Sequence, residues 1–244
     1  MLLEFTPLQL AATGLLFIWA GFVRSGLGFG GAALGLPLML FINDQPLYWL
    51  PMIGIHLLFF SGLTLRTRIN NVDWVYLKKA AVFVLPGALI GVFGLISLPT
   101  HWLVIFIYSI TLFYAFMWLL NIKLHSNNRW LDGFLLLSGG YVAGISLSGA
   151  PLMVAVFMRN IAAHQLRNTM FVLWFTIVSI KLATLYAFGI RLHALDALLL
   201  IPVAAIGHVI GLRVHDYILQ NDRLFKQVIG GVLAVICLLG LYNV

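Results

Sequence analysis

The sequence predicts an all-α integral membrane protein built from two inverted repeats. Three observations support this fold class. Hydrophobic residues make up 62% of the 244 residues, charged residues only 9%, and the mean hydropathy is +1.05, whereas an ordinary soluble domain is about 25% charged. The basic residues lie mostly in short segments between long apolar runs, as in the cytoplasmic loops of membrane proteins. Two of these runs are interrupted by breaks rich in glycine or serine.

Eight apolar runs have about the length, roughly 20 residues, that a helix needs to cross a bilayer. The first run is too long for one straight helix and contains the first break, and the fifth run contains the second break. We expect each of the other six runs to form a single transmembrane helix. The runs cover residues 8–42, 47–65, 77–98, 101–122, 131–158, 168–190, 194–214 and 224–243.

Matching motifs in the two halves of the chain indicate an internal duplication. The Pro-x-x-x-x-Gly motif that begins at Pro86 recurs at Pro202, 116 residues later. The two breaks correspond at nearly the same offset, since Gly31 and Gly149 are 118 residues apart. Each repeat would consist of a broken segment followed by three transmembrane helices, and the two repeats together would form one membrane domain. The expected repeats cover residues 1–122 and 123–244.

The basic residues predict that the two broken segments are re-entrant hairpins, which enter and leave on the same side. If all eight runs crossed the membrane, basic loops would lie on both sides, contrary to the positive-inside rule. With two hairpins, 11 of the 14 Lys and Arg residues lie in loops on one side, and Arg191 alone lies on the other. Three crossings in each half also invert the second repeat relative to the first. Arg24 and Lys181 remain inside apolar runs.

The two breaks predict a site for a small anion near the middle of the bilayer. A helix N-terminus presents unpaired backbone N–H groups and the positive end of the helix dipole, and glycine lets a ligand approach the backbone closely. In the first break we expect Gly28, Gly30 and Gly31 to supply such donors. In the second we expect Ser148 to be an N-cap and to bind the anion with Gly149. The alternative is that these small residues only permit close helix packing.

Four titratable residues inside the apolar runs are further candidates. A charge within the membrane is costly and is by default a functional hypothesis. Arg24 immediately precedes the first break, where its guanidinium could reach an oxyanion. Lys181 either joins the same substrate site or extends to the membrane interface. His56 and His208 lie in the middle of their runs and are candidate proton relays, although a hydrogen-bonded structural histidine is more common.

Other classes of function find little support in the sequence. It contains no metal-ligand spacing, nucleotide-phosphate loop or dinucleotide fingerprint, and the single Cys237 excludes an intrachain disulfide. We therefore expect no cofactor, no bound metal and no enzyme activity. The basic residues form no continuous stripe of the kind that binds nucleic acid. The expected partners are the lipid bilayer and a small anion, with a second copy of the chain in a homodimer as a further option.

Both breaks and one loop resemble those of the TauE/SafE sulfite exporter family. The first break reads Gly26-Leu27-Gly28-Phe29-Gly30-Gly31 with Pro37 beyond it, and the first basic loop ends in Asn71-Val72-Asp73-Trp74. The resemblance implies a transporter of sulfite, sulfonates or related sulfur or organic oxyanions in the inner membrane of a bacterium, with export as the expected direction. The second break, Ser146-Leu147-Ser148-Gly149-Ala150-Pro151, departs from the usual G-x-G-G-P pattern. Serine hydroxyl groups there stand in place of glycines, and we expect this difference to affect which substrate is selected.

Two other functions stay open at this point. Ser148 and Gly149 together with His208 are similar to the serine and histidine of rhomboid intramembrane proteases, in which a histidine on another helix activates a serine. A protease, however, has no need of a matching break in the first half. A passive channel for the same anion shares all of the sequence features described above. No motif of an ATP-hydrolysing motor is present, so we expect a gradient or the membrane potential to drive transport.

Overall fold

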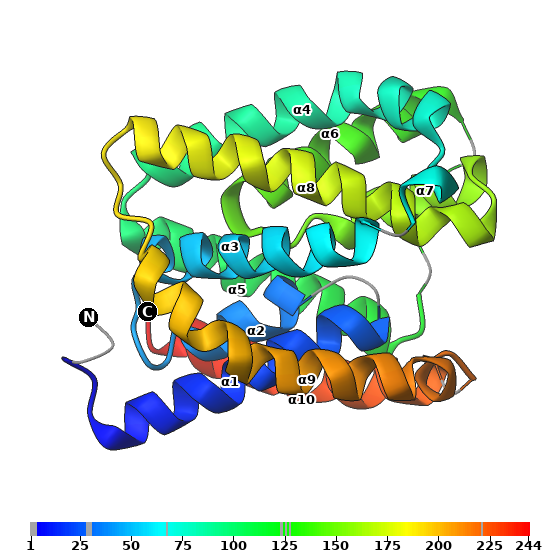
Figure 1. Cartoon of the computed structure of the whole chain (residues 1–244). Coiled ribbons are helices and arrows are strands. Elements are labelled where there is room, and N and C mark those ends of the chain that lie inside the picture. Colours follow the sequence, from blue (N-terminus) through cyan, green and yellow to red (C-terminus); the bar gives the residue numbers. More distant parts are fainter. Residues whose placement is uncertain are drawn as a thin grey trace. The chain divides into compact units, whose positions relative to one another are not determined.

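The computed structural model is all-helical over the residues that it describes, which are 4–27, 31–66, 68–122, 124, 126, 128–220 and 222–244. Figure 1 labels the helices along the chain. In chain order they are α1 (Pro7–Leu27), α2 (Gly31–Met39), α3 (Pro46–Leu65), the 3₁₀ helix η2 (Ile69–Asn71), α4 (Trp74–Ser97), α5 (Thr100–Leu119), α6 (Arg129–Ser146), α7 (Ala150–Asn160), α8 (Ala163–Ala187), α9 (Ala194–Gln220) and α10 (Asp222–Tyr242).

Seven of the described helices are long and apolar enough to cross a membrane, namely α1, α3, α4, α5, α8, α9 and α10. The helices α2 and α7 have 9 and 11 residues and are too short to cross a bilayer alone. The predicted fold class, an all-α integral membrane protein, is confirmed.

Both predicted broken segments are interrupted helices. The first apolar run forms α1 and α2, and the fifth forms α6 and α7. The limbs are unequal, with 21 and 9 residues in the first segment and 18 and 11 in the second. Because α1 alone is about as long as a bilayer is thick, its length does not require it to turn back at the midplane. Re-entry of the two segments stays a prediction.

The chain divides into two compact units, each of which is described by itself. Both units combine residues from the two predicted halves of the chain, so the division into repeats stays a prediction. The first unit consists of Met1–Met52, Pro99–Lys123 and His193–Val244, and the second of Ile53–Leu98 and Leu124–Leu192.

In the first unit, α1 lies along α9, and both helices are seen side by side in blue and orange in Figure 1. Two glycines bring the backbones into contact. A Cβ atom on Gly21 would lie 2.3 Å from the carbonyl oxygen of Ala204, and one on Gly207 would lie 1.8 Å from that of Ile18. Only glycine fits at such distances, so the sequence fixes where the two helices cross.

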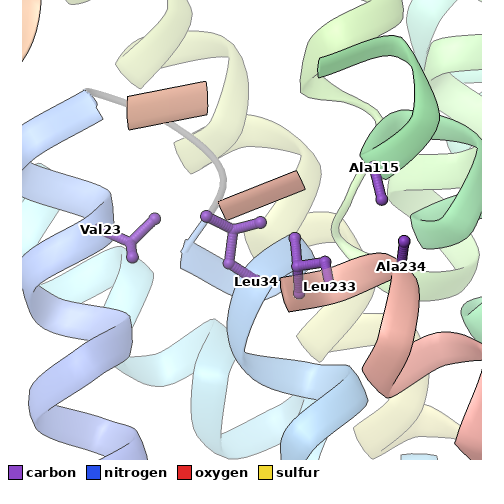
Figure 2. Packing of buried hydrophobic residues seen from close by; sticks show 5 residues of the cluster. All are labelled: Val23, Leu34, Ala115, Leu233 and Ala234. Carbon is purple, nitrogen blue, oxygen red and sulfur yellow. The ribbon is translucent and has the colours of Figure 1, made fainter. Parts of the chain in front are cut away.

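A cluster of buried apolar side chains holds the two ends of the first break (Figure 2). Val23 comes from α1 and Leu34 from α2, and they belong to one cluster with side chains of α5 and α10. The indole Nε1 of Trp19 also donates a hydrogen bond to the carbonyl oxygen of Leu34, at 3.2 Å. The start of α2 is therefore anchored against the end of α1. The cluster consists of Val23, Leu34, Ala115, Leu233 and Ala234.

In the second unit, α4 lies along α6 in the same way. A Cβ atom on any of four glycines would lie 2.2 Å from a carbonyl oxygen of the facing helix. Two of these glycines belong to α4 and two to α6, so the contact is backbone against backbone over about two turns. The four glycines are Gly87, Gly91, Gly140 and Gly144.

The two helix pairs repeat each other residue by residue. The facing pairs are Gly207 with Ile18 and Gly211 with Phe22 in the first unit, and Gly87 with Leu137 and Gly91 with Tyr141 in the second. Helix α9 thus corresponds to α4 at an offset of 120 residues, and α6 to α1 at an offset of 119. The offset of 116 expected from the two proline motifs differs by one helical turn. Proline and glycine recur often in these apolar helices. A match of the two motifs can therefore differ by one turn from the match of the glycines that make contact.

Candidate functional site

The second break is a sharp interruption between α6 and α7. Helix α6 ends at Ser146, and Leu147 follows in the left-handed conformation, with φ of 58° and ψ of 21°. The N-cap of α7 is Gly149, so the prediction that Ser148 is the N-cap is wrong by one residue. A Cβ atom at position 149 would lie 1.9 Å from the carbonyl oxygen of Gly139. Gly149 is therefore required where α7 starts against α6.

The two serines of this break are hydrogen-bonded to each other, and Ser146 is also bonded to the backbone of α6. The hydroxyl of Ser146 donates to the carbonyl oxygen of Val142 at 3.0 Å, and its Oγ is hydrogen-bonded to that of Ser148. Each hydroxyl has one proton to donate. Since the proton of Ser146 points to Val142, Ser148 donates to Ser146. Neither serine then has a free donor for an anion, so binding through Ser148 requires its hydroxyl to rotate.

Lys181 of α8 lies against the second break. Its Nζ donates to the carbonyl oxygens of Gly144 at 2.8 Å and of Ile145 at 3.1 Å, in the last turn of α6. The residue is 1% exposed, so the alternative that it extends to the membrane interface is wrong. A cation at the C-terminal end of a helix is favoured by the helix dipole. No signal in the sequence placed Lys181 beside the break, because the contact depends on how α8 packs on α6.

Among the described residues no carboxylate forms a salt bridge with Lys181. In the part of the chain that the structure describes, Lys181 is the one charged side chain that is fully buried, and no Asp or Glu is buried with it. Its ammonium group has three N–H donors, and the two carbonyl oxygens account for two of them. The second break therefore combines a buried lysine amine with two hydroxyl groups and a helix start.

The first break is described in part, because Gly28 and Gly30 lie outside the described residues. Gly31 begins α2, and a Cβ atom there would lie 2.9 Å from the carbonyl oxygen of Ala20 and 3.1 Å from Cβ of Arg24. Arg24 is partly buried in the last turn of α1. The structure thus places Arg24 beside Gly31 at the start of α2.

His208 has a partner that the sequence did not reveal. Its Nδ1 is hydrogen-bonded to Oγ of Ser25, which is buried one residue beyond Arg24. The glycine contact of α1 with α9 explains the pairing, since a Cβ atom on Gly211 would lie 3.0 Å from that of Ser25. His208 is bonded to Ser25 in the first unit and Ser148 to Ser146 in the second, and the pairing of Ser148 with His208 that a serine protease would need stays untested.

The remaining histidine candidate, His56, is buried in α3. Its ring packs against that of Phe60, with the ring centroids 6.3 Å apart. No group of three His, Cys, Asp or Glu side chains in the described ranges is placed to hold a metal ion.

The loop before α4 has a structural role. The carboxylate of Asp73 caps α4 by accepting from the backbone N–H of Tyr76, and the backbone N–H of Asp73 donates to Oγ1 of Thr169. The side chain of Asn71 donates to the carbonyl oxygen of His164. These bonds tie the connection between α3 and α4 to the first turns of α8, the helix that carries Lys181.

The predicted site residues therefore fall into two groups. Lys181, Ser148 and Gly149 come together at the second break, in the second unit. Arg24 and Gly31 come together at the first break, in the first unit, with His208 bonded to the neighbouring Ser25. A single site shared by both breaks stays a prediction.

Comparison with models of known protein families gives a match over most of the chain. The sequence model of a protein family described as Sulfite exporter TauE/SafE matches residues 13–239. The matched range includes both breaks and every predicted site residue. No curated protein and no solved structure matches the chain.

Proposed function

The chain belongs to the sulfite exporter TauE/SafE family, and we propose that it is a secondary transporter of small oxyanions such as sulfite and sulfonates. The family is one of membrane transporters, and the seven apolar helices make the chain a multi-pass integral membrane protein. The inner membrane of a bacterium is the proposed location, and export is the proposed direction.

The observation that carries the proposal is the buried ammonium group of Lys181 at the second break. Removing a charge from water costs several kcal/mol, so a protonated Lys181 is stabilised by an anion beside it. An oxyanion at the break would supply the missing negative charge. Broken helices are also where transporters hold their substrates.

In the proposed mechanism the two breaks bind the anion together and expose it alternately to the two sides. Lys181 and Arg24 supply positive charge, and backbone N–H groups at the starts of α2 and α7 supply donors, with Gly28, Gly30 and Gly31 in the first break. Ser148 and Gly149 border the anion on the other side. The hydroxyl of Ser148 would turn from Ser146 to the anion when it binds.

The membrane potential is sufficient to drive export. An anion carries its own charge across that potential, which is worth about 2.3 kcal/mol per charge per 100 mV. Outward movement from a negative interior is therefore downhill without a coupled ion. His56 and His208 stay the candidates for a proton relay if protons are coupled as well.

Flux measurements in proteoliposomes test the proposal. Vesicles would be assayed with sulfite, thiosulfate, methanesulfonate and acetate, using the native chain, Lys181→Met and Lys79→Met, in which an exposed lysine of α4 is replaced. We expect saturable flux of at least one sulfur oxyanion, lowered about tenfold or more in Lys181→Met and unchanged in Lys79→Met. The same rate with and without the native protein for every anion would overturn the proposal.

A further inference from the structure

The end of α6 gathers oxygen atoms that the helix itself cannot satisfy. The carbonyl groups of Gly144 and Ile145 belong to the last turn, where an α-helix leaves its C=O groups without intrahelical partners. Both point to Nζ of Lys181, at 2.8 and 3.1 Å. The hydroxyl oxygens of Ser146 and Ser148 follow in the chain and are also buried. The negative end of the dipole of α6 lies here as well.

Such a set of oxygens suits a cation. Carbonyl and hydroxyl oxygens are the ligands that hard cations prefer. In transporters with discontinuous helices, unwound carbonyls and the C-terminal ends of half-helices coordinate the coupling cation. In this chain the positive charge at these oxygens is an ammonium group, which is attached to a different helix, α8. The Lys181 side chain thereby links α8 to the end of α6, as an ion bound by both helices would.

We propose that Lys181 fills a latent site for a small monovalent cation, formed by the carbonyl oxygens of Gly144 and Ile145, and so replaces a coupling ion by a tethered one. For its consequence on transport this inference rests on the proposed function. The native chain then needs no free cation at these oxygens, and its transport does not depend on Na⁺ or K⁺. Removal of the side chain opens the site to a free ion.

Thermal unfolding tests the site without any transport assay. Lys181→Ala removes the ammonium group and leaves a space beside the carbonyl oxygens. Lys181→Met is the matched control, because its side chain fills much of that space without a charge. Each purified protein would be melted in NaCl, in KCl and in N-methyl-D-glucamine chloride at equal ionic strength, with the native chain and Lys79→Ala alongside.

We expect the Tm of Lys181→Ala to be about 3 °C higher in NaCl or KCl than in the organic salt, as for an ion at several times its Kd. The native chain, Lys181→Met and Lys79→Ala should show no such difference. Equal Tm values for folded Lys181→Ala in all three salts would overturn the inference. If Lys181→Ala does not fold, Lys181→Ser is tested in its place, with the same two outcomes.

Flux assays separate this inference from the proposed function. The native chain should carry oxyanion equally well with or without Na⁺ and K⁺, whereas Lys181→Ala should carry it only with one of them. A cation-dependent Tm in a protein whose native form moves no oxyanion would support the cation site and contradict the transport proposal. Oxyanion flux by the native chain, with no cation effect on Lys181→Ala in either assay, would support the transport proposal and contradict the cation site.

Discussion

Arg24 and Lys181 each place a positive charge at one of the two breaks, by different routes. Arg24 belongs to α1, so the first broken segment carries its own basic residue. At the offset of 119 that relates α1 to α6, the second segment has Ala143 in its place. The charge at the second break comes instead from Lys181 of α8. Each break thus has a basic residue beside it, which comes from the broken segment itself in the first case and from α8 in the second.

Arg24→Ala is expected to abolish oxyanion transport and to leave expression intact. The substitution removes the positive charge next to Gly31, and the helix tolerates alanine well. Uptake rates would be measured in proteoliposomes, with the amount of reconstituted protein as reference. Arg213→Ala, which removes an exposed arginine of α9, should transport normally. Native rates in Arg24→Ala would remove this residue from the mechanism.

The contacts of α1 with α9 and of α4 with α6 explain how the breaks are held. In both pairs, glycines bring backbone against backbone with no side chain between them. Close packing of this kind resists deformation. The glycine contacts therefore hold α1 against α9 and α6 against α4, and in this way they help to fix the helix end from which each break begins.

Gly21→Ala is expected to destabilise the protein, by about 1–3 kcal/mol if the cost is that of overpacking a core. The added methyl group would lie 2.3 Å from the carbonyl oxygen of Ala204. Gly14→Ala, on the same helix, is the matched control, because the nearest atom is Cγ1 of Val203 at 3.9 Å. It should be neutral or stabilise the protein by up to about 1 kcal/mol. Thermal unfolding of the two variants would show whether the close contact or the helix propensity of alanine determines the change in stability.

The sequence predicted the helices and the two breaks well, because these depend on local composition. Runs of apolar residues define the spanning helices, and the residues from Leu147 to Pro151 include a serine, a glycine and a proline, which weaken a helix interior. The position of Lys181 could not be predicted, since it depends on the packing of α8 against α6. The same is true of the bond between Ser25 and His208, which follows from the glycine contact of α1 with α9.

The basic loops predict the membrane topology of the whole chain. The loops between α5 and α6 and between α7 and α8 should both be cytoplasmic, because the positive-inside rule applies to short basic loops. Reporter fusions at Asn128 and at His164 test this, and a fusion at Arg191 should lie on the opposite side. Opposite sides for Asn128 and His164 would mean that the second broken segment crosses the membrane and does not re-enter.

Carrier and channel differ in how they respond to substrate on the far side. A carrier with one alternately exposed site exchanges bound anions, whereas a channel lets each anion follow its own gradient. The membrane potential can drive either of them. The central claim, a carrier for small oxyanions, therefore depends on exchange and not on flux alone.

Solute counterflow tests that claim most directly. Proteoliposomes loaded with unlabelled sulfite would be diluted into a trace of radiolabelled sulfite with the membrane potential clamped at zero. A carrier predicts that the label accumulates transiently above its equilibrium level, and that Lys181→Met abolishes this overshoot. Labelled sulfite that only equilibrates would contradict the carrier in favour of a channel, and label that enters no faster than in protein-free vesicles would contradict sulfite transport itself.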